Sequence, residues 1–350
     1  MREFVENIWK QEEYTYEAAY GFIPNIHAYI HDENIDTSDG IKERDCMLIV
    51  PGGGYCMCVS HEGELVAKVF YEQGMNVFVL TYTTDITMSV PLKKQPLEDI
   101  SRAVRFIRKR ADEYRIKDKK LIICGFSAGA HVCGSLAVHF DDVTDISPEY
   151  KGVSNRPDGV ILSYPVITSG EYTHIYSIQA LLGYSPTEEE LKYVSIEKNV
   201  TENTPPCFIW QTLTDDLVPV ENSYLMAEAL RAKKVPYAHY VFPSGFHGLS
   251  YPNEEFFEGL KGGDYTFDQL QRAIKAVKLG KGVNVSDKRK AELEAQFPDI
   301  IPDEWPVDKE KSVNEEKSEA VPEGAPQIDR TWIEDIGLWP QLARVWMNRL

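Results

Sequence analysis

The residues best suited to chemistry lie in segment 121–131, which reads Leu-Ile-Ile-Cys-Gly-Phe-Ser-Ala-Gly-Ala-His. An apolar run ends at Gly125, and a sequence compatible with a helix follows Ser127. The two glycines that flank this serine permit a sharp turn from strand to helix, because they carry no Cβ that would clash. Such a turn exposes the Ser127 hydroxyl above the N-terminus of the helix, so we interpret Ser127 as a nucleophile.

A serine nucleophile needs a base, because its hydroxyl reacts poorly at neutral pH. His247 is the best candidate, since it follows the last predicted strand in a loop that could reach Ser127 from the carboxyl edge of a sheet. Three other histidines lie within or at the ends of predicted helices and strands, and we interpret them as structural: His131, His139 and His239.

The base in turn needs a carboxylate that fixes its tautomer. Asp215 and Asp216 follow the predicted strand 207–210, which places a carboxylate at the same sheet edge as His247. We interpret Asp215 as the acid and Asp216 as a turn or helix-capping residue. Asp85 and Asp158 lack this placement.

The glycine-rich segment 51–55, Pro-Gly-Gly-Gly-Tyr, follows the first long apolar strand. Backbone amides in such a loop can approach a substrate closely and stabilise a developing oxyanion. We therefore predict that the amides of Gly53, Gly54 and Ala128 form an oxyanion hole. A phosphate-binding loop is the rival interpretation, but the Lys-Ser/Thr ending of a P-loop is absent, and a plain tight turn is the other.

Acidic residues outnumber basic ones, with 55 Asp and Glu against 37 Lys and Arg, for a formal net charge of −18 at pH 7. This excess disfavours binding to nucleic acid and to anionic membranes. Met1–Lys10 lacks a basic and apolar signal pattern, and no apolar run approaches the length of about 18 residues that a membrane span needs. We expect a soluble, cytoplasmic protein.

The six cysteines occur mostly in apolar, strand-like runs, and none forms a CxxC pair or a Cys/His array with zinc-like spacing. We expect free, buried thiols and neither a metal nor a cofactor. The close pair Cys56 and Cys58 leaves a redox or metal role as the alternative.

Strand-like and helix-like segments alternate along the chain, which predicts an α/β fold with a mostly parallel sheet and helices on both faces. A leading antiparallel hairpin is expected within residues 14–30, and Leu338, Leu342, Val345 and Trp346 predict a closing amphipathic helix. The predicted strands cover residues 46–50, 77–82, 121–124, 160–166, 207–210 and 239–242, and the predicted helices cover 62–71, 96–114, 128–140 and 220–233.

Two segments interrupt this alternation. Residues 170–204 are short, acidic and Tyr-rich helical pieces, which suit either a small cap over the site or a plain surface crossover. Residues 261–330 form an insertion before the last helix, with a capping box at Thr266 and Gln269, a further cap at Ser286 and a flexible stretch over 306–327. We expect 1–260 plus 331–350 to form the catalytic domain.

Taken together, these motifs resemble the α/β-hydrolase family, and more narrowly its branch of bacterial carbohydrate and acetyl-xylan-type esterases, described as feruloyl-esterase-like or hormone-sensitive-lipase-like. The resemblance covers about residues 40–260 and the final helix. It rests on PGGGY at 51–55, GFSAGAH at 125–131, TDDLVPVENS at 214–223 and GFHGLS at 245–250. It implies a triad of Ser127, Asp215 and His247.

This resemblance implies a serine esterase that removes short acyl groups, first of all O-acetyl groups, from a small ester or an acetylated oligosaccharide. An amide hydrolase on the same fold and a non-catalytic ligand-binding protein are the alternatives. Pro51 and Gln211 stand where many relatives have histidine, which affects the expected substrate more than the chemistry. We also expect residues 261–330 to pack beside the catalytic mouth, either in cis or as a contact between subunits of a homo-oligomer, and to narrow the pocket toward small acyl groups.

Overall fold

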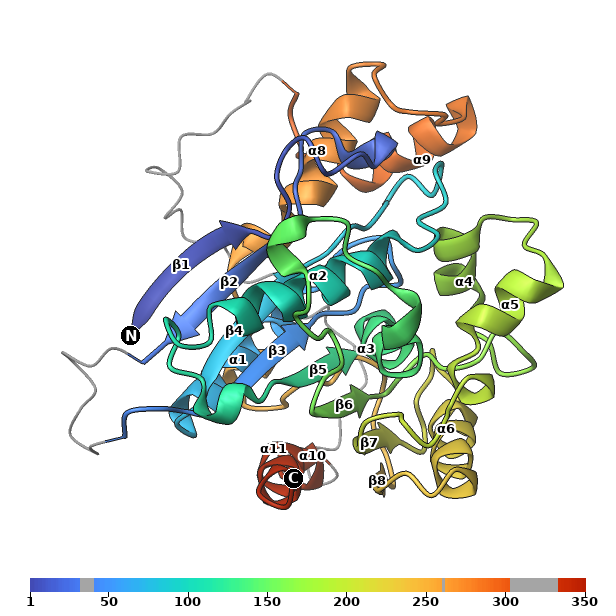
Figure 1. The fold of residues 1–350 in the computed structure, drawn as a ribbon. Coiled ribbons are helices and arrows are strands. Elements are labelled where there is room, and N and C mark those ends of the chain that lie inside the picture. The colour runs from blue at the N-terminus through green and yellow to red at the C-terminus, as the bar shows by residue number, and fades with distance from the viewer. Residues whose placement is uncertain (32–40, 260–261, 303–332) are drawn as a thin grey trace.

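The computed structural model describes residues 1–31, 41–259, 262–302 and 333–350. In this part of the chain, eight strands form one sheet in the order β1-β2-β4-β3-β5-β6-β7-β8 (Figure 1). Strands β3 to β8 run parallel, whereas β2 is antiparallel to both β1 and β4. The strands are β1 Arg2–Asn7, β2 Asn25–Ile30, β3 Cys46–Val50, β4 Asn76–Thr81, β5 Ile122–Phe126, β6 Gly159–Ser163, β7 Cys207–Thr212 and β8 Tyr237–Phe242.

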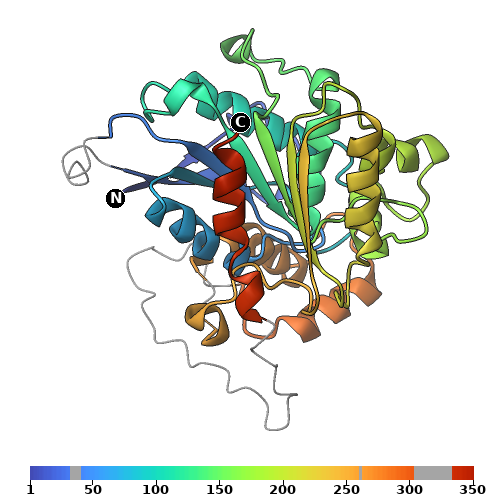
Figure 2. The same ribbon diagram turned by 90° about the horizontal axis from the view of Figure 1, so that it is seen from below.

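Helices cover both faces of this sheet (Figure 2), as the alternating sequence pattern predicts for parallel strands. The α-helices are α1 Glu64–Glu72, α2 Gln95–Lys109, α3 Ala128–His139, α4 Ile175–Leu182, α5 Glu188–Val194, α6 Glu221–Ala232, α7 Glu254–Phe257, α8 Asp268–Lys278, α9 Asp287–Gln296, α10 Ile333–Ile336 and α11 Trp339–Met347. The fold is therefore the α/β-hydrolase fold that we expected.

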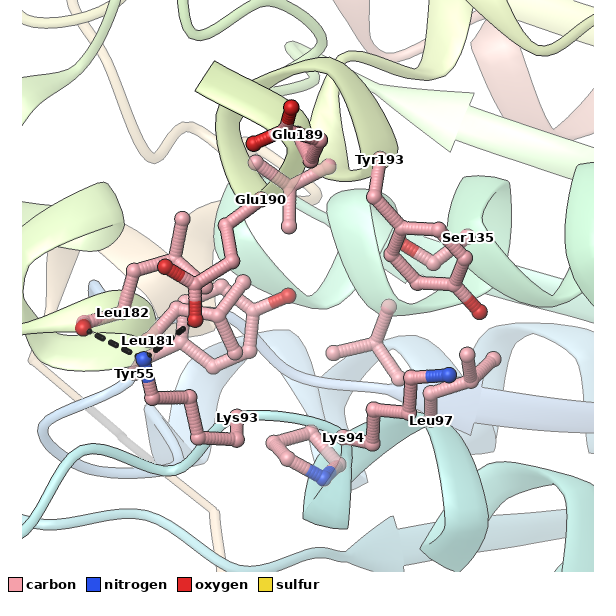
Figure 3. Close-up of a pocket in the computed structure, with 13 residues that line it drawn as sticks. Tyr55, Lys93, Lys94, Leu97, Ser135, Leu181, Leu182, Glu189, Glu190 and Tyr193 are labelled. Carbon is pink, nitrogen blue, oxygen red and sulfur yellow. Dashed lines mark hydrogen bonds and ion pairs between the residues drawn. The ribbon is translucent and has the colours of Figure 1, made fainter. Parts of the chain in front are cut away.

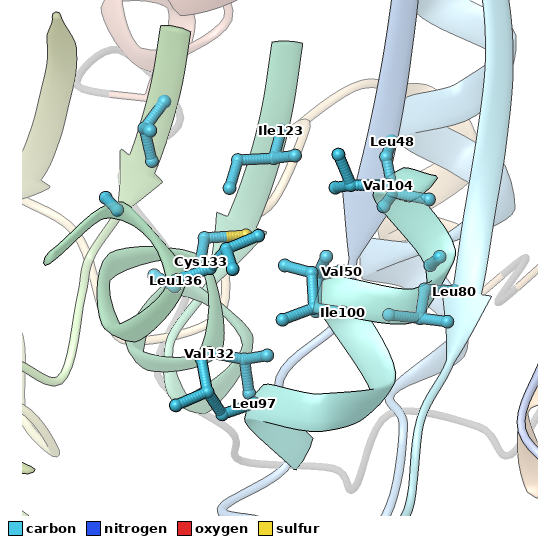
Figure 4. Close-up of a cluster of buried hydrophobic side chains, with 14 of the residues drawn as sticks. Leu48, Val50, Leu80, Leu97, Ile100, Val104, Ile123, Val132, Cys133 and Leu136 are labelled. Atoms are coloured by element: carbon cyan, nitrogen blue, oxygen red, sulfur yellow. The ribbon is translucent and has the colours of Figure 1, made fainter. Parts of the chain in front are cut away.

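The core has two layers, because successive side chains of a strand point to opposite faces. In β3, Leu48 and Val50 pack with α2 and α3, where they belong to the cluster drawn in Figure 4. Met47 and Ile49 point the other way and belong to the layer under α1 and α11. All five residues of β3 are buried, and a strand buried on both faces must be apolar at every position. This explains why the sequence of β3 is an unbroken apolar run.

The N-terminal hairpin differs from the prediction, since its first strand is β1 at Arg2–Asn7 and lies outside residues 14–30. β1 is an edge strand with no fully buried residue, so it lacks the apolar alternation that would reveal it.

The predicted apolar stripe of the last helix is also partly wrong. Leu338 and Val345 are about half exposed, and the buried residues of α11 are Trp339, Pro340, Ala343 and Trp346. Trp339 stacks on Trp210 of β7 with ring centroids 5.3 Å apart. The face of α11 that packs on the sheet therefore begins one residue later than expected, at Trp339 rather than at Leu338.

The described part of the insertion after β8, residues 262–302, packs in cis. Ile274 and Val277 of α8 form a small core with Leu293 of α9 and with Ile86 from the loop after β4. The predicted capping box at Thr266 and Gln269 is absent, because the Gln269 side chain instead exchanges hydrogen bonds with the backbone of Thr84. Ser286 does cap α9, by accepting from the Arg289 amide.

The six cysteines are free, and five of them are buried, as expected; Cys56 is half-buried. Among the described helices, none has the length and apolar character to cross a membrane. The stretch 306–327, predicted to be flexible, lies outside the described residues.

Candidate active site

Ser127 occupies a strained turn between β5 and α3. Its backbone φ of 51° and ψ of −117° fall in a region that non-glycine residues rarely adopt. A Cβ on Gly129 would collide with the Val50 carbonyl oxygen, and one on Gly125 would collide with the backbone of α3. Glycines at these two positions therefore allow the turn, and backbone strain is typical of a nucleophilic serine in such a strand-to-helix turn. The expected exposure is wrong, since Ser127 is only 5% exposed.

The structure brings the three predicted triad residues together. The Ser127 Oγ lies 2.8 Å from His247 Nε2, and His247 Nδ1 lies 2.8 Å from Asp215 Oδ2. A carboxylate only accepts hydrogen bonds, so Nδ1 carries the imidazole proton and Nε2 is left to accept from the serine hydroxyl. The Asp215 side chain is fully buried, which shields this chain of hydrogen bonds from water.

Further donors hold the Asp215 carboxylate in place. Its Oδ1 accepts from the amides of Leu217 and Val218 at 3.0 and 2.8 Å. Its Oδ2 accepts from the Gln211 side chain at 3.3 Å, and the same Gln211 amide also donates to the Val218 carbonyl. Gln211, which departs from the pattern of many relatives, thus contributes to orienting the acid.

Asp216 does not contact the imidazole. Its Oδ1 accepts from the His247 backbone amide at 2.9 Å, so it fastens the loop that carries the histidine. The sequence indicated a turn or helix-capping role for this residue, whereas the observed contact joins two loops that are 31 residues apart in the chain.

The glycine-rich loop after β3 lies directly against the nucleophile. A Cβ on Gly52 would come within 2.8 Å of the Ser127 Cβ, so only glycine permits this approach. Gly53 and Gly54 adopt φ of 118° and 63°, and in the described part of the chain neither amide donates to a protein acceptor. The Ala128 amide is in the first turn of α3, where helix geometry leaves it without an intrahelical acceptor.

Glu62 and Tyr164 are part of this site but were not predicted. Glu62 is 3% exposed and accepts hydrogen bonds from the Gly52 amide and the Tyr164 hydroxyl. The Tyr164 ring packs edge-on against His247, with centroids 4.9 Å apart. In the sequence Glu62 is one acid among many at a helix start, so no local pattern distinguishes it.

The segment 170–204 reaches the site through His174, which precedes α4. Its Cε1 lies 3.9 Å from the point where a Cβ on Gly54 would sit, and its Nδ1 pairs with the Ser177 hydroxyl at 2.8 Å. Burial lowers the pKa of His174, and the neighbouring His247 lowers it further. The segment thus places an imidazole beside the glycine loop, while the role of residues 170–204 as a cap stays a prediction.

The insertion also approaches the glycine loop, from another side. Met57 follows this loop and packs with the small core formed by α8 and α9, while its Cγ lies 2.8 Å from the Cβ position of Gly53. Arg289 of α9 donates to the Ile86 carbonyl in the same region. The segment therefore supports the loop in cis. Its effect on acyl length and its part in an oligomer stay predictions.

A cavity of about 350 Å³ lies between α2, α3, α4 and α5 (Figure 3). Its walls are largely apolar, with Tyr55, Leu97 and Leu181 among them, and Lys93 pairs with Glu190 at its edge. None of the three triad residues lines it.

The remaining histidines make structural contacts. His131 is fully buried, where its Nε2 donates to the Val194 carbonyl and its Nδ1 accepts from the Tyr55 hydroxyl. His139 pairs with Asp142, and His239 pairs with Ser223. In the described residues, no group of three or more His, Cys, Asp or Glu side chains could hold a metal ion.

Comparison with known proteins gives the family context of this geometry. The BD-FAE family matches residues 37–230, which is more than half of the chain. A solved acetyl ester-xyloside bifunctional hydrolase from Caldicellulosiruptor lactoaceticus superimposes with a TM-score of 0.66 and 32% sequence identity, over 81% of this chain and 98% of that one.

Two curated relatives are similar over part of their length. Endo-1,4-beta-xylanase B of Butyrivibrio fibrisolvens is 67% identical over 277 residues, which cover 79% of this chain and 42% of that protein. An acetylxylan esterase of Xylanibacter ruminicola is 30% identical over 211 residues, which cover 58% of this chain and 40% of that protein. The chain thus spans less than half the length of these relatives.

Proposed function

Because the chain belongs to the BD-FAE family, we propose that it is a serine carbohydrate esterase that removes short acyl groups, O-acetyl groups first, through an acyl-enzyme. The observation that carries this proposal is the continuous hydrogen-bond chain from Ser127 through His247 to Asp215. It lies beside a glycine loop with two unengaged amides, which is the arrangement that acyl transfer requires.

In the first half of the reaction, the Ser127 Oγ attacks the ester carbonyl while His247 Nε2 takes its proton. Asp215 stabilises the imidazolium that forms and keeps its orientation. The negative charge moves to the former carbonyl oxygen, where the amides of Gly53, Gly54 and Ala128 donate hydrogen bonds to it. The imidazolium then protonates the leaving alcohol.

In the second half, His247 takes a proton from a water molecule that attacks the acyl-enzyme. Collapse of the second tetrahedral intermediate releases the acid, and the proton returns to Ser127 Oγ. Every proton transfer in both halves runs through the same imidazole nitrogen, which the Asp215 contact keeps free to accept.

The substrate class is inferred from the relatives. The names of an acetylxylan esterase and of an acetyl ester-xyloside hydrolase support an acetylated sugar or oligosaccharide as the substrate. Amide hydrolysis, the alternative from the sequence, has no comparable support among these relatives. A cytoplasmic location remains a prediction of the sequence.

A panel of substrates tests this proposal. Purified protein should hydrolyse p-nitrophenyl acetate faster than the octanoate ester or p-nitroacetanilide, and it should release acetate from acetylated xylo-oligosaccharides. Ser127→Ala and His247→Ala should each reduce kcat by about 10⁶-fold, since nucleophile and base act as one unit. Ser135→Ala, on the same helix but outside the triad, serves as the matched control.

Each other outcome points to a named rival. Faster cleavage of the anilide would make the protein an amide hydrolase. Absence of turnover together with absence of fluorophosphonate labelling at Ser127 would favour a non-catalytic binding protein. Preference for the octanoate ester would refute the assignment to short acyl groups.

A further inference from the structure

Glu62 is a buried acidic side chain that the proposed reaction does not use. It ends the short 3-10 helix η3 (Ser60–Glu62) and is 3% exposed. In the described residues, no lysine, arginine or histidine forms an ion pair with it. A buried carboxylate without a cation is costly to maintain unless hydrogen bonds replace its lost hydration, so its partners indicate why it is there.

Its two oxygens serve two different segments. Oε2 accepts from the Gly52 backbone amide at 2.6 Å, and Oε1 accepts from the Tyr164 hydroxyl at 2.7 Å. The Tyr164 oxygen itself accepts from the Ser250 amide at 3.2 Å, so its own proton is directed to Glu62. Both oxygens therefore act as acceptors, as those of a carboxylate do.

The first partner belongs to the glycine loop. Because the Gly52 amide points to Glu62, it is not available to an oxyanion, and the next two amides in the loop are the unengaged ones. Gly52 also lies directly against the Cβ of Ser127. The bond to Glu62 thus fixes the peptide from which the proposed oxyanion donors extend.

The second partner belongs to the surroundings of His247. The Tyr164 ring stands at 71° to the imidazole with centroids 4.9 Å apart, and its hydroxyl fastens Ser250, three residues after His247. His61, the residue before Glu62, makes a second hydrogen bond to the His247 loop, because its Nε2 donates to the Gly248 carbonyl at 3.1 Å.

We propose that Glu62 is a positioning residue that holds the oxyanion loop and the His247 loop in one fixed relation, through Gly52 and Tyr164. This inference rests on the proposed esterase function. Both loops act on the same tetrahedral intermediate, one on its oxyanion and the other on the protons of its oxygen substituents, so the distance between the loops decides how well the oxyanion donors and the base can act together. Glu62 connects the two loops without touching the substrate.

The test is Glu62→Gln, because glutamine has almost the same shape but only one acceptor oxygen. Its NH₂ group must face either the Gly52 amide, which is itself a donor, or the Tyr164 hydroxyl, whose proton then loses its acceptor. We expect kcat for p-nitrophenyl acetate to fall by about 10- to 100-fold, since a displacement on the order of 1 Å can cost about 100-fold. KM should change by less than about threefold.

Tyr164→Phe tests the same connection with the ring retained, and it decides the question if Glu62→Gln does not fold. It should lower kcat in the same range, and the double variant should fall no more than about twofold below the worse single variant, because both changes break one connection. Glu197→Gln is the matched control: Glu197 also accepts from a hydroxyl, that of Thr168, but contacts neither loop.

All rates are divided by the concentration of active sites titrated with a fluorophosphonate. A purely structural role for Glu62 would lower the melting temperature while kcat per titrated site stays at the wild-type value, and this result would overturn the proposal. Additive losses in the double variant would overturn it as well. If the wild-type protein cleaves no ester, the proposed function fails first and the inference fails with it.

Discussion

Replacing Asp215 with asparagine should trap His247 in the wrong tautomer. Asp215 Oδ1 accepts from two backbone amides, those of Leu217 and Val218. The asparagine oxygen must take this position, because an NH₂ group there would face two donors. The NH₂ group is then at the position of Oδ2, which lies 2.8 Å from His247 Nδ1, against 3.1 Å for Oδ1. It donates to Nδ1 over this shorter contact, which moves the imidazole proton to Nε2.

A protonated Nε2 cannot accept from Ser127, so the loss should be severe although the side chain keeps its shape. Variants of this kind in serine hydrolases lose about 10⁴-fold in kcat. That factor corresponds to about 5.4 kcal/mol of transition-state stabilisation, at about 1.36 kcal/mol for each factor of ten. We expect a loss of this size for Asp215→Asn, with an unchanged melting temperature within a few degrees.

Asp216→Asn is the matched control, because an asparagine oxygen can still accept from the His247 amide. Its kcat should remain within about threefold of the wild type. Steady-state hydrolysis of p-nitrophenyl acetate, normalised to titrated sites, measures both variants. More than a tenth of the wild-type kcat in Asp215→Asn would exclude the trapped tautomer, and so would a larger loss of kcat in Asp216→Asn than in Asp215→Asn.

Three further results are expected. Gly52→Ala should lower kcat by at least about 100-fold, because its Cβ would push the loop from the nucleophile, whereas Gly170→Ala should have little effect on ester hydrolysis. Burial lowers the pKa of His131 to about 4, so the unfolded state binds a proton at a higher pH than the folded state does. Urea titrations should therefore show the free energy of unfolding falling by about 1.4 kcal/mol per pH unit as the pH drops from about 6.5 toward 4. His131→Gln should lose this slope. Ile274→Ala should cost about 2 to 5 kcal/mol in urea unfolding if the insertion belongs to the folded core, while the exposed Val345→Ala should change stability by less than about 0.5 kcal/mol.

The candidate site could be predicted to the extent that its residues follow strand ends in local motifs. Ser127, Asp215 and His247 each come shortly after a strand of the parallel sheet, and parallel strands bring their carboxyl ends to one edge. Their meeting follows from topology alone. Glu62 could not be found in this way, because its partner Tyr164 is 102 residues away and only tertiary packing brings the two together.

The same distinction explains the errors in the fold. The last helix carries two apolar stripes one residue apart, and its own periodicity cannot choose between them. Stacking of Trp339 on Trp210 selects the stripe that contains Ala343, a residue small enough to let the helix approach the sheet. The sequence did not reveal strand β1, because an edge strand with no fully buried residue needs no regular apolar pattern.

The reactivity of two buried cysteines can report local unfolding around the nucleophile. Cys124 and Cys133 lie on either side of Ser127, three residues before it and six after it, and burial raises the pKa of both thiols. A thiol reacts as its thiolate and only when a reagent can reach it, so neither reacts while the turn around the nucleophile is closed. The rate at which a disulfide reagent modifies these two thiols in native buffer therefore measures how often the catalytic turn opens, with no engineered cysteine.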